Sequence, residues 1–429
     1  NGEWTTQADQ AATFAIEKAT IAGIDAAFDD GRMTCVEVIQ AHLRRIEAYD
    51  DRGPALNALI TINDGALAVA AEFDRQGMTA PTRRPLHCIP VILKDNFDTA
   101  DMPTTGGSVT LARSVPLRDA FVVRKLREAG AIVLAKANMT ELALGGITVS
   151  SLGGQTRNPY DLTRTPGGSS GGTGAAIAAS FGVIGTGSDT GQSIRSPASA
   201  DSLVGLRATR GLISRSGVIP ASTTQDEVGP ITRTVEDAAR MLNVMVGYDP
   251  DDPVTAFGAQ RIPPTYSAFL DRSGLQGARI GVLTQFFGRE PIHDEVNRVT
   301  EAAIEKMTSA GGTLVRITIP ELERLTRNIQ VANYEAKPAF DSYLASLGPS
   351  APVRSLDEFV ARGAFHPSIR ASLQAGQRAT RDDPEYKNRL LRRDELRSAV
   401  MNAFAANKLD AILYPHQRSL VVPSREEHV

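Results

Sequence analysis

The sequence predicts an α/β fold in which a mixed central β-sheet carries helices on both faces. Up to residue 245, short apolar runs alternate with segments whose apolar side chains recur at helical spacing. After a polar connector at residues 249–253, a strand, a helix and a strand follow again. We expect these late strands to extend the same sheet, so that residues 1–429 form a single domain.

Each element expected before residue 165 has a local signal. Helical spacing of apolar residues indicates the helices; Thr34 is the N-cap of the second, and Gly130 ends the last. Uninterrupted apolar runs indicate buried strands, and Ile89–Leu93 is the clearest of them. The helices are expected at residues 8–29, 34–49, 65–76 and 119–129, and the strands at 55–63, 89–93 and 131–135.

The second part of the chain continues this alternation. The small residues 173–180 indicate a tightly packed helix, and the Gly-, Ser- and Thr-rich segment 205–230 predicts short turns. Residues 320–400 are mostly helical and charged without strand character, and we expect them to form a cap or lid over the entrance of a site. The remaining helices are expected at 235–245 and 294–309, and the strands at 181–186, 278–283, 313–319 and 409–414.

Composition places the chain among ordinary globular proteins. Its residues are 42% hydrophobic and 22% charged, and a net charge of −3 gives no electrostatic reason to expect nucleic acid or a membrane surface as a partner. No apolar run approaches the roughly 18 residues of a membrane helix. No His, Cys and Asp cluster has the spacing of metal ligands, so neither a metal nor another cofactor is expected.

The chain has two cysteines, Cys35 and Cys88. Two cysteines cannot build a disulfide framework, and we interpret both as buried small apolar side chains, with one mutual disulfide as the alternative. The sequence begins at Asn1 without Met. This leaves the localisation open between the cytoplasm and export after removal of a leader.

The region from Thr165 to Ala200 is where chemistry is expected. It contains nine glycines and seven serines, residues that weaken helices and strands, and a site explains such a composition better than a structural element does. Ser169 precedes the expected helix, and Ser193 follows the expected strand 24 residues later. A helix followed by a returning strand would bring both serines to one end of a sheet, where α/β folds bind ligands.

Lysine is the expected base for such a serine. A serine hydroxyl needs a base to become a nucleophile, and none of the six histidines lies in the serine-rich region, which weakens a Ser-His-Asp interpretation without excluding it. Lys94 follows an apolar strand, where burial lowers a lysine pKa. Lys136 also follows an apolar run, and the residues alone leave both lysines as candidates.

Several blocks of sequence, in order, resemble the amidase signature family, whose members hydrolyse amides with a Ser-cis-Ser-Lys triad. Those at the candidate site are Lys94, the glycine-serine block with Ser169, and Gly187-Ser188-Asp189-Thr190-Gly191-x-Ser193-Ile194-Arg195. Others are Thr34-Cys35-Val36-Glu37-Val38, Lys136-Ala137-Asn138-Met139-Thr140-Glu141, Arg157-Asn158-Pro159-Tyr160, Gly211-Leu212-Ile213-Ser214-Arg215-Ser216-Gly217 and Asp226-x-x-Gly229-Pro230-x-x-Arg233-Thr234-Val235. The resemblance covers roughly residues 30–250.

The resemblance implies a mechanism. Ser193 would attack the carbonyl, Ser169, at a cis peptide bond, would relay the proton, and neutral Lys94 would be the final base, which leaves Lys136 a structural role. An oxyanion hole would be formed by the backbone amides of Thr190, Gly191, Gln192 and Ser193. Supporting roles would fall to Ser170, Asp189 and Arg195, the last two as an ion pair.

The expected activity is therefore amide hydrolysis, cleaving the C–N bond of a linear carboxamide through an acyl-enzyme on Ser193. The alternatives are a carbamate (urethane) hydrolase, a peptide amidase, the amidase subunit of a partner-dependent amidotransferase, and a ligand-binding protein with a Gly-rich loop. Phosphate-loop motifs are absent, and the polar segment 155–165 before Gly167-x-Ser169-x-Gly171 does not fit an α/β-hydrolase elbow. The expected partner is a small amide or carbamate, and the expected assembly is a monomer or homodimer.

Two features depart from the family pattern. Many members have Gly where this chain has Gln192, so we expect Gln192→Gly to alter specificity without abolishing turnover. The chain ends at Val429, whereas members usually continue with a Gly- and Pro-rich segment that adds strands and one wall of the acyl pocket. We expect that wall to be incomplete.

Overall fold

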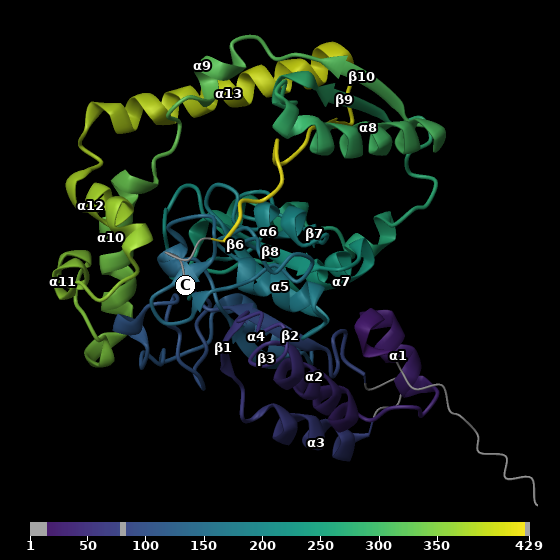
Figure 1. Cartoon of the computed structure of the whole chain (residues 1–429), viewed down its shortest axis with the longest axis vertical. Helices are drawn as coiled ribbons and strands as arrows, with labels where there is room; N and C mark the ends of the chain where they lie inside the picture. Colours follow the sequence, from purple (N-terminus) through teal and green to yellow (C-terminus); the bar gives the residue numbers. More distant parts are fainter. Residues whose placement is uncertain (1–14, 78–82, 425–429) are drawn as a thin grey trace, which may run out of the picture.

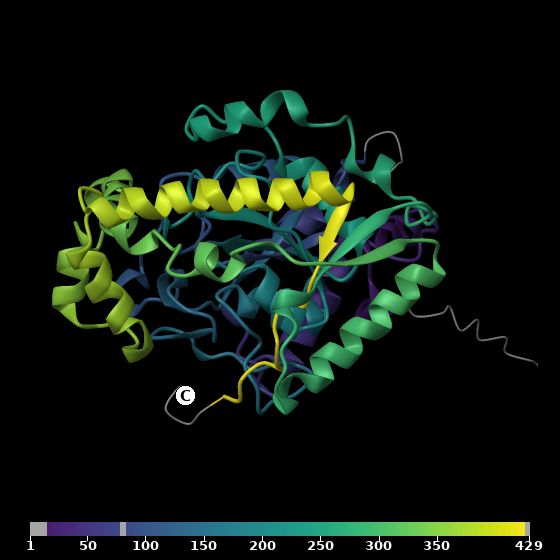
Figure 2. The same ribbon diagram turned by 90° about the horizontal axis from the view of Figure 1, so that it is seen from above.

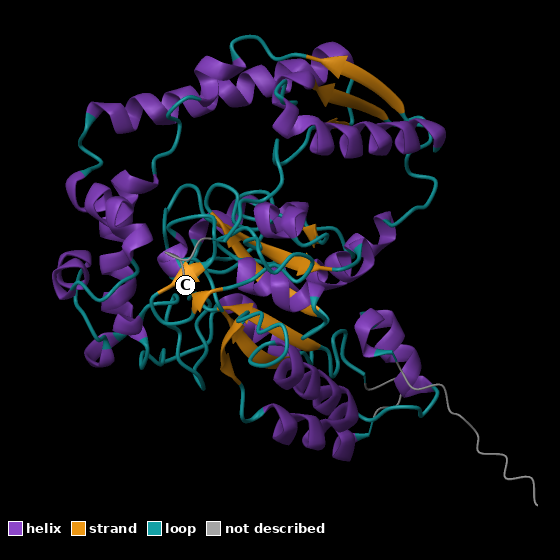
Figure 3. Cartoon of the chain, in the orientation of Figure 1, coloured by secondary structure: helices purple, strands orange, loops and turns teal. Residues whose placement is uncertain are grey.

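The computed structural model describes residues 15–77 and 83–424. A six-stranded mixed sheet lies at its centre (Figure 1; Figure 3). The strand order is β1-β3-β2-β6-β8-β7; β3, β2 and β6 run parallel, whereas β1 and β8 run antiparallel to their neighbours. The strands are β1 Leu59–Ile62, β2 Pro90–Lys94, β3 Ile132–Ala137, β6 Ile184–Asp189, β7 Val204–Gly205 and β8 Glu227–Thr232.

Helices cover both faces of this sheet, which confirms the predicted fold class. Helix α5 packs against β2 and β6, whereas α4 and α7 contact each other and pack against β3 and β8, respectively. Helices α2 and α3 pack together, and α3 contacts β3. These helices are α1 Ile21–Asp29, α2 Cys35–Tyr49, α3 Ala66–Gln76, α4 Phe121–Glu128, α5 Gly171–Ala178, α6 Arg195–Ala200 and α7 Val235–Met245.

Helix α5 is built from small residues because it lies directly against other backbone segments. A methyl group on Gly172 would lie 2.1 Å from the carbonyl oxygen of Asn138 and 2.6 Å from that of Ala58. Only glycine permits such an approach. The close packing brings Ser169 and Ser170, which immediately precede α5, next to the central sheet.

The late strands form a sheet of their own, so the prediction that they extend the central sheet is wrong. β9 (Arg279–Leu283) lies between β10 (Thr313–Ile317) and β11 (Ala411–Leu413), and all three are parallel. This sheet buries its own apolar cluster with α9 (Leu322–Thr326) and α13 (Pro384–Asn407), and so it needs no strand of the central sheet as a partner. The cluster contains Leu283, Ile317, Ile319, Leu322 and Ala403. Figure 1 shows it, with α8 (Asp294–Ser309), apart from the central sheet.

Residues 320–400 are mostly helical, as predicted; α10, α11 and α12 lie at one side of the central sheet, whereas α9 and α13 lie across the top of the view in Figure 1. Helix α10 packs against α11 and α12, and their apolar cluster extends to Leu111, Leu142 and Ile219. Helix α13 runs from this group to the three-stranded sheet (Figure 2), and α9 contacts it. These helices are α9 Leu322–Thr326, α10 Ala332–Ser346, α11 Leu356–Arg362, α12 Arg370–Arg378 and α13 Pro384–Asn407.

Two elements near the N-terminus differ from the sequence prediction. The helix expected at residues 8–29 is broken where it is described: a 3₁₀ turn at Ile16–Lys18 ends before Thr20, whose hydroxyl accepts the N–H of Gly23 and starts α1 there. Residues 8–14 lie outside the described part. The strand expected at 55–63 is shortened to β1, because Ala55 and Asn57 have positive φ.

Some short elements have no counterpart in the sequence prediction. β8 lies partly in the segment expected as turns, because Gly229 and Pro230 in its middle conceal the strand. Helix α6 and the two-stranded ribbon of β4 (Val149–Ser150) and β5 (Gly154–Gln155) were also not predicted. All of these elements lie within or beside the serine-rich region.

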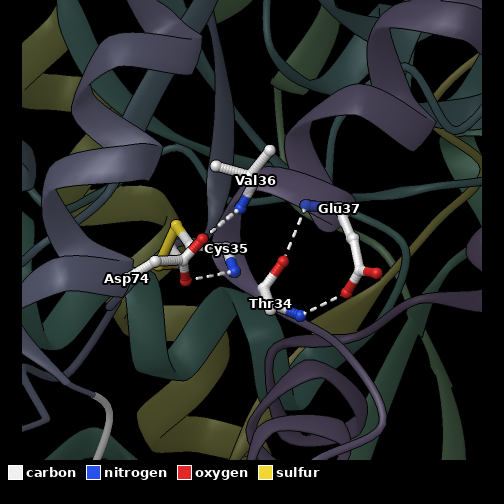
Figure 4. The surroundings of a disulfide bond; sticks show 6 residues. Thr34, Cys35, Val36, Glu37 and Asp74 are labelled. Carbon is white, nitrogen blue, oxygen red and sulfur yellow. Dashed lines mark hydrogen bonds between the residues drawn. A yellow bond between two sulfur atoms is a disulfide. The ribbon is translucent and has the colours of Figure 1, made fainter.

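The two cysteines form a disulfide, with Cα atoms 5.5 Å apart, so the interpretation of separate apolar side chains is wrong and its alternative is correct. Both residues are fully buried, as expected. The bond joins the first residue of α2 to the segment before β2. Figure 4 shows that Asp74 accepts the N–H groups of Cys35 and Val36 at this end of α2, beside the capping pair Thr34 and Glu37.

Candidate active site

The parallel strands β2 and β6 end at the same edge of the central sheet, where their C-terminal residues bring polar side chains together. Lys94 is the last residue of β2, and Asp189 is the last residue of β6, the strand beside it. The turn before α5 supplies Ser169, and the turn after β6 supplies Ser193. This topology confirms the prediction that both serines lie at one end of the sheet.

Lys94 is fully buried and bonded to hydroxyl and carbonyl groups. Its Nζ donates to Ser169 Oγ at 2.7 Å, to Ser188 Oγ at 2.8 Å and to the Ser188 carbonyl oxygen at 3.2 Å. No carboxylate of residues 15–77 or 83–424 forms an ion pair with it. Burial lowers the pKa of Lys94 to about 7, although the negative charges of Asp189 and Asp226 oppose the shift.

Ser169 is fully buried and follows a cis peptide bond between Gly168 and Ser169, as the resemblance implied. Its carbonyl oxygen accepts the N–H of Thr140 at 3.1 Å. The hydroxyl of Thr148 donates to the Gly167 carbonyl oxygen at 2.7 Å and accepts the N–H of Gly171 at 3.1 Å. The backbone on both sides of Ser169 is therefore fixed.

Ser193 lies in the turn that leaves β6, with 5% of its surface exposed. Its carbonyl oxygen accepts the N–H of Ser170 at 3.2 Å, which joins the two serine-containing turns. Its hydroxyl has no hydrogen-bond partner among the described residues, and neither do the four successive backbone N–H groups from Thr190 to Ser193. This turn combines a free hydroxyl with unpaired donors.

The ion pair expected between Asp189 and Arg195 is present. Asp189 is fully buried, 3.1 Å from Arg195 and 2.9 Å from Arg207, and it accepts the N–H of Ile194 at 3.1 Å. Burial raises the pKa of Asp189, but the hydrogen bond and charge of Arg195, with the charge of Arg207, outweigh burial and lower it. The carboxylate stays charged and fixes the turn.

Sequence reasoning missed two side chains near the site, Asn96 and Arg207. Asn96 Nδ2 donates to Ser188 Oγ at 2.9 Å, so that hydroxyl is held between Asn96 and Lys94. Arg207 is the second cation on Asp189. The period-two pattern of a strand could not have placed Asn96, because Asp95 and Asn96 lie in a turn in which the N–H of Phe97 donates to the Lys94 carbonyl oxygen at 3.1 Å. Arg207 had no local signal.

Lys136 has a different environment from Lys94. It is fully buried, but its Nζ lies 3.3 Å from Asp95 Oδ1 and donates to Thr104 Oγ1 at 2.9 Å and to the Pro103 carbonyl oxygen at 3.1 Å. Burial lowers its pKa, and the charge of Asp95 opposes this. Its bonds therefore run to Asp95 and its neighbours, and not to either serine.

A cavity of about 390 Å³ opens beside Ser188. Asp226 lines it from the strand side, and Tyr343 of α10 lines it from the helical segment. Both arginines in its wall are paired, Arg215 with Asp252 at 2.7 Å and Arg118 with Asp251 at 3.0 Å. The Asp226 carboxylate has no ion-pair partner among the described residues, but it accepts the N–H groups of Ala221 and Ser222, each at 2.8 Å. A neutral polar group fits such a wall better than an ion does.

Gln192 lies at the open side of the turn, and both Gln192 and Gly191 are exposed. A methyl group placed on Gly146 would lie 2.8 Å from Gln192 Nε2, so the glutamine side chain covers that glycine. Ser170, in contrast, is fully buried, and its hydroxyl donates to the Ser188 carbonyl oxygen at 3.3 Å.

The described residues contain neither a group of metal ligands nor a membrane-spanning helix. No group of three or more His, Cys, Asp or Glu side chains in that part of the chain could hold a metal ion. No helix there is long and apolar enough to cross a membrane.

The chain was compared with known proteins. The family model described as Amidase matches residues 37–427. A probable amidase of Arabidopsis thaliana is 36% identical over 424 residues, which cover 94% of this chain and 80% of that protein. A glutamyl-tRNA(Gln) amidotransferase subunit of Halorhodospira halophila is 40% identical over 308 residues, 72% of this chain and 62% of the relative. The chain thus spans about three fifths of the length of that relative.

Solved structures agree with these relatives. The native peptide amidase of Stenotrophomonas maltophilia superposes with a TM-score of 0.83 at 35% identity, covering 97% of this chain and 88% of that one. An amidase family protein of Bacillus anthracis superposes with a TM-score of 0.84 at 31% identity, covering 92% and 80%. Because the family model matches most of the chain, this protein belongs to the amidase signature family, the family that its sequence resembles, and it is a hydrolase acting on carbon–nitrogen bonds.

Proposed function

We propose that this protein is a serine amidase that hydrolyses linear carboxamides through an acyl-enzyme on Ser193. The observation that carries this proposal is the bond of 2.7 Å between Lys94 Nζ and Ser169 Oγ, made by a lysine that is buried without a counter-ion. A lysine whose pKa is about 7 is neutral in half of the molecules at that pH and accepts a proton there. Ser193 can then pass its proton to this lysine through Ser169.

In the proposed reaction, Ser193 Oγ attacks the amide carbonyl carbon while its proton passes to Ser169 Oγ and the proton of Ser169 passes to Lys94 Nζ. The carbonyl oxygen becomes an oxyanion, and the unpaired N–H groups of Thr190, Gly191, Gln192 and Ser193 are the proposed donors to it. Collapse of the tetrahedral intermediate breaks the C–N bond, and Lys94 returns a proton through Ser169 to the leaving amine. Water cleaves the acyl-enzyme by the same relay.

The substrate we favour is a neutral amide with polar groups around it. The cavity beside Ser188 has two arginine–carboxylate pairs and hydroxyl groups from Ser222 and Ser342, which suit neutral hydrogen-bonding groups such as peptide units. Among the structural neighbours is a peptide amidase. Carbamates carry the same carbonyl bonded to nitrogen and remain the second candidate.

We also propose that residues 1–429 form a single domain in which the helical segment 320–400 is a cap. Tyr343 and Ser342 of that segment line the cavity, which supports the proposal. Removing α11 and α12 is expected to change the preference among large amides more than the rate with a small one. Equal loss for both would contradict the cap.

We further propose that the protein acts as a monomer or homodimer in an oxidising compartment. The Cys35–Cys88 disulfide supports such a compartment, because disulfides are rare in the reducing cytosol. Mass spectrometry of the alkylated protein from its native host should find no free thiol, and two alkylated cysteines would contradict the proposal. A second protein chain in the natively purified material would favour the amidotransferase alternative.

The activity is tested with an equimolar mixture of 4-nitroacetanilide, glycyl-phenylalaninamide and ethyl N-phenylcarbamate, each followed by mass spectrometry. Ser193→Ala serves as the blank. We expect a Ser193-dependent loss of an amide, led by the amidated dipeptide. Faster loss of the carbamate would reverse the substrate preference, and equal loss with Ser193→Ala would overturn the proposed nucleophile.

A further inference from the structure

One glutamine lies between the turn that carries Ser193 and the helical segment 320–400. We infer that Gln225 is a positioning residue that holds the peptide unit between Thr190 and Gly191 and ties it to the start of α10. The inference rests on the proposed function, since it matters to catalysis only if the N–H groups of this turn stabilise an oxyanion.

The Gln225 side chain uses both ends of its amide. With 6% of its surface exposed, it donates from Nε2 to the Thr190 carbonyl oxygen at 3.3 Å and also to Gln330 Oε1. Its Oε1 accepts the N–H of Val331, the residue before α10, at 2.6 Å. Val331 is fully buried, so this N–H has no access to water as a substitute.

The bond to Thr190 has a geometric consequence for Gly191. The Thr190 carbonyl and the Gly191 N–H belong to one planar peptide unit, in which they point in opposite directions. Fixing the carbonyl oxygen against Gln225 therefore fixes the direction of the Gly191 N–H, one of the proposed oxyanion donors. The next carbonyl along the chain, that of Gly191, is held by Arg195.

The loop around Gln225 is fastened to both sides. Towards the turn, Asp226 accepts the hydroxyl of Thr190 at 2.5 Å. Towards the helices, the fully buried Glu335 of α10 accepts the hydroxyl of Ser222, the N–H of Thr224 at 3.0 Å and the hydroxyl of Tyr386 at 2.8 Å. The loop is thus a fixed support, and Gln225 is the side chain on it that reaches both segments.

This arrangement predicts a kinetic signature. Oxyanion donors act in the transition state and contribute little to binding of the ground state, so their misplacement lowers kcat and leaves KM nearly unchanged. We expect Gln225→Met, which keeps the length of the side chain and removes its hydrogen bonds, to lower kcat about 10- to 100-fold with KM within about twofold.

The chain offers a matched control. Gln285 donates from Nε2 to the Ile319 carbonyl oxygen at 3.1 Å and accepts the Ile319 N–H at 2.7 Å, beside the three-stranded sheet. Gln285→Met therefore removes an equivalent pair of bonds far from Ser193 and is expected to leave kcat unchanged. Gln225→Glu is the second variant, because it keeps the acceptor for the Val331 N–H and loses the donor to Thr190.

The experiment measures turnover and hydrogen–deuterium exchange in each variant. The substrate is the component of the amide and carbamate mixture that the wild type consumes fastest. We expect faster exchange over residues 188–194 in both Gln225 variants, and over 327–336 only in Gln225→Met. A kcat loss no greater than that of Gln285→Met, a change confined to KM, or unchanged exchange over 188–194 would overturn the inference. If the wild type shows no Ser193-dependent turnover, the proposed function fails, and the exchange data alone then decide whether Gln225 holds both segments.

Discussion

Lys94 and Lys136 are two fully buried lysines near the ends of neighbouring strands, and they differ in the groups around the ammonium. Lys136 faces the carboxylate of Asp95 at 3.3 Å, whereas Lys94 is bonded to the hydroxyl groups of Ser169 and Ser188. Burial lowers the pKa of both side chains, and at Lys136 the charge of Asp95 is the main opposing influence. The proposed base therefore differs from the other buried lysine in lacking a counter-ion, and not in its burial.

The largest effect in this comparison is expected for Lys94→Met. Without a proton acceptor next to Ser169, kcat/KM should fall at least about 1,000-fold, as in other hydrolases that lose the base of the nucleophile. Stability should fall by less than about 2 kcal/mol, because the substitution leaves hydroxyl groups and no orphaned charge. Turnover with 4-nitroacetanilide and urea unfolding measure the two quantities. Retention of a tenth of the activity would remove Lys94 from the mechanism.

The reverse pattern is expected for Lys136→Met. It leaves the Asp95 carboxylate buried without its cation, which should cost about 3–5 kcal/mol of the free energy of unfolding. Activity per folded molecule, counted by burst titration, should change little. The double variant Lys136→Met/Asp95→Asn should recover most of the stability, and a failure to do so would show that the ion pair is not the cause.

The same pair of lysines shows how far the sequence could lead. The family resemblance singled out Ser169, Ser193 and Lys94 as candidates. Apolar runs precede Lys136 and Lys94 alike, so the burial of each lysine was predictable, whereas the counter-ion of Lys136 was not. Asp95 follows Lys94 in the chain and yet pairs with Lys136 on the next strand. Which acidic group faces which lysine depends on strand pairing, which local sequence does not encode.

Pairing between distant segments also explains the errors in the fold. The strands β9, β10 and β11 have the same apolar character as those of the central sheet, and periodicity cannot tell which sheet they join. The Cys35–Cys88 bond likewise depends on α2 meeting the segment before β2. Elements defined by local signals were predicted closely, for example α2 with its Thr34 cap and α7, which the structure places at Val235–Met245.

The pH dependence sharpens the comparison further. If Lys94 acts as a neutral base, kcat/KM should rise about tenfold per pH unit below pH 7 and level off above it, because burial lowers the pKa of Lys94 to about 7. A pH series with the amidated dipeptide measures the profile. A midpoint near the ordinary lysine value of 10.5 would mean that Lys94 carries a proton throughout the working range.

Asp201 is an acidic counterpart of Lys94, fully buried with no partner for either carboxylate oxygen among the described residues. Burial raises its pKa well above 3.8, so the folded protein holds this proton more tightly than the unfolded chain does. The contribution of protonated Asp201 to the free energy of unfolding is therefore fully present below pH 3.8, and it is lost as the pH rises through the folded-state pKa. At pH 7 the free energy of unfolding of Asp201→Asn, measured with urea, should exceed that of the wild type by at least about 1 kcal/mol. At pH 3.5 the two proteins should have the same free energy of unfolding. An unchanged difference at both pH values would exclude titration of Asp201 as the cause.

The smallest effect is expected for Gln192→Gly. The residue is exposed, its side chain covers Gly146, and the hydrogen bonds of Lys94 run to Ser169 and Ser188 and not to it. We expect the ratio of kcat/KM between the amidated dipeptide and 4-nitroacetanilide to change by about tenfold or less, with turnover retained. Loss of activity as deep as in Ser193→Ala would place Gln192 among the catalytic groups.

The most direct test of Lys94 as a neutral base is the titration of its ammonium by NMR in protein labelled with ¹³C at lysine Cε. Lys94→Met and Lys136→Met identify the two buried resonances. A Lys94 resonance that titrates near pH 7 is the predicted result, because burial lowers the pKa of Lys94 to about 7. A Lys94 resonance still charged at pH 9 would contradict it.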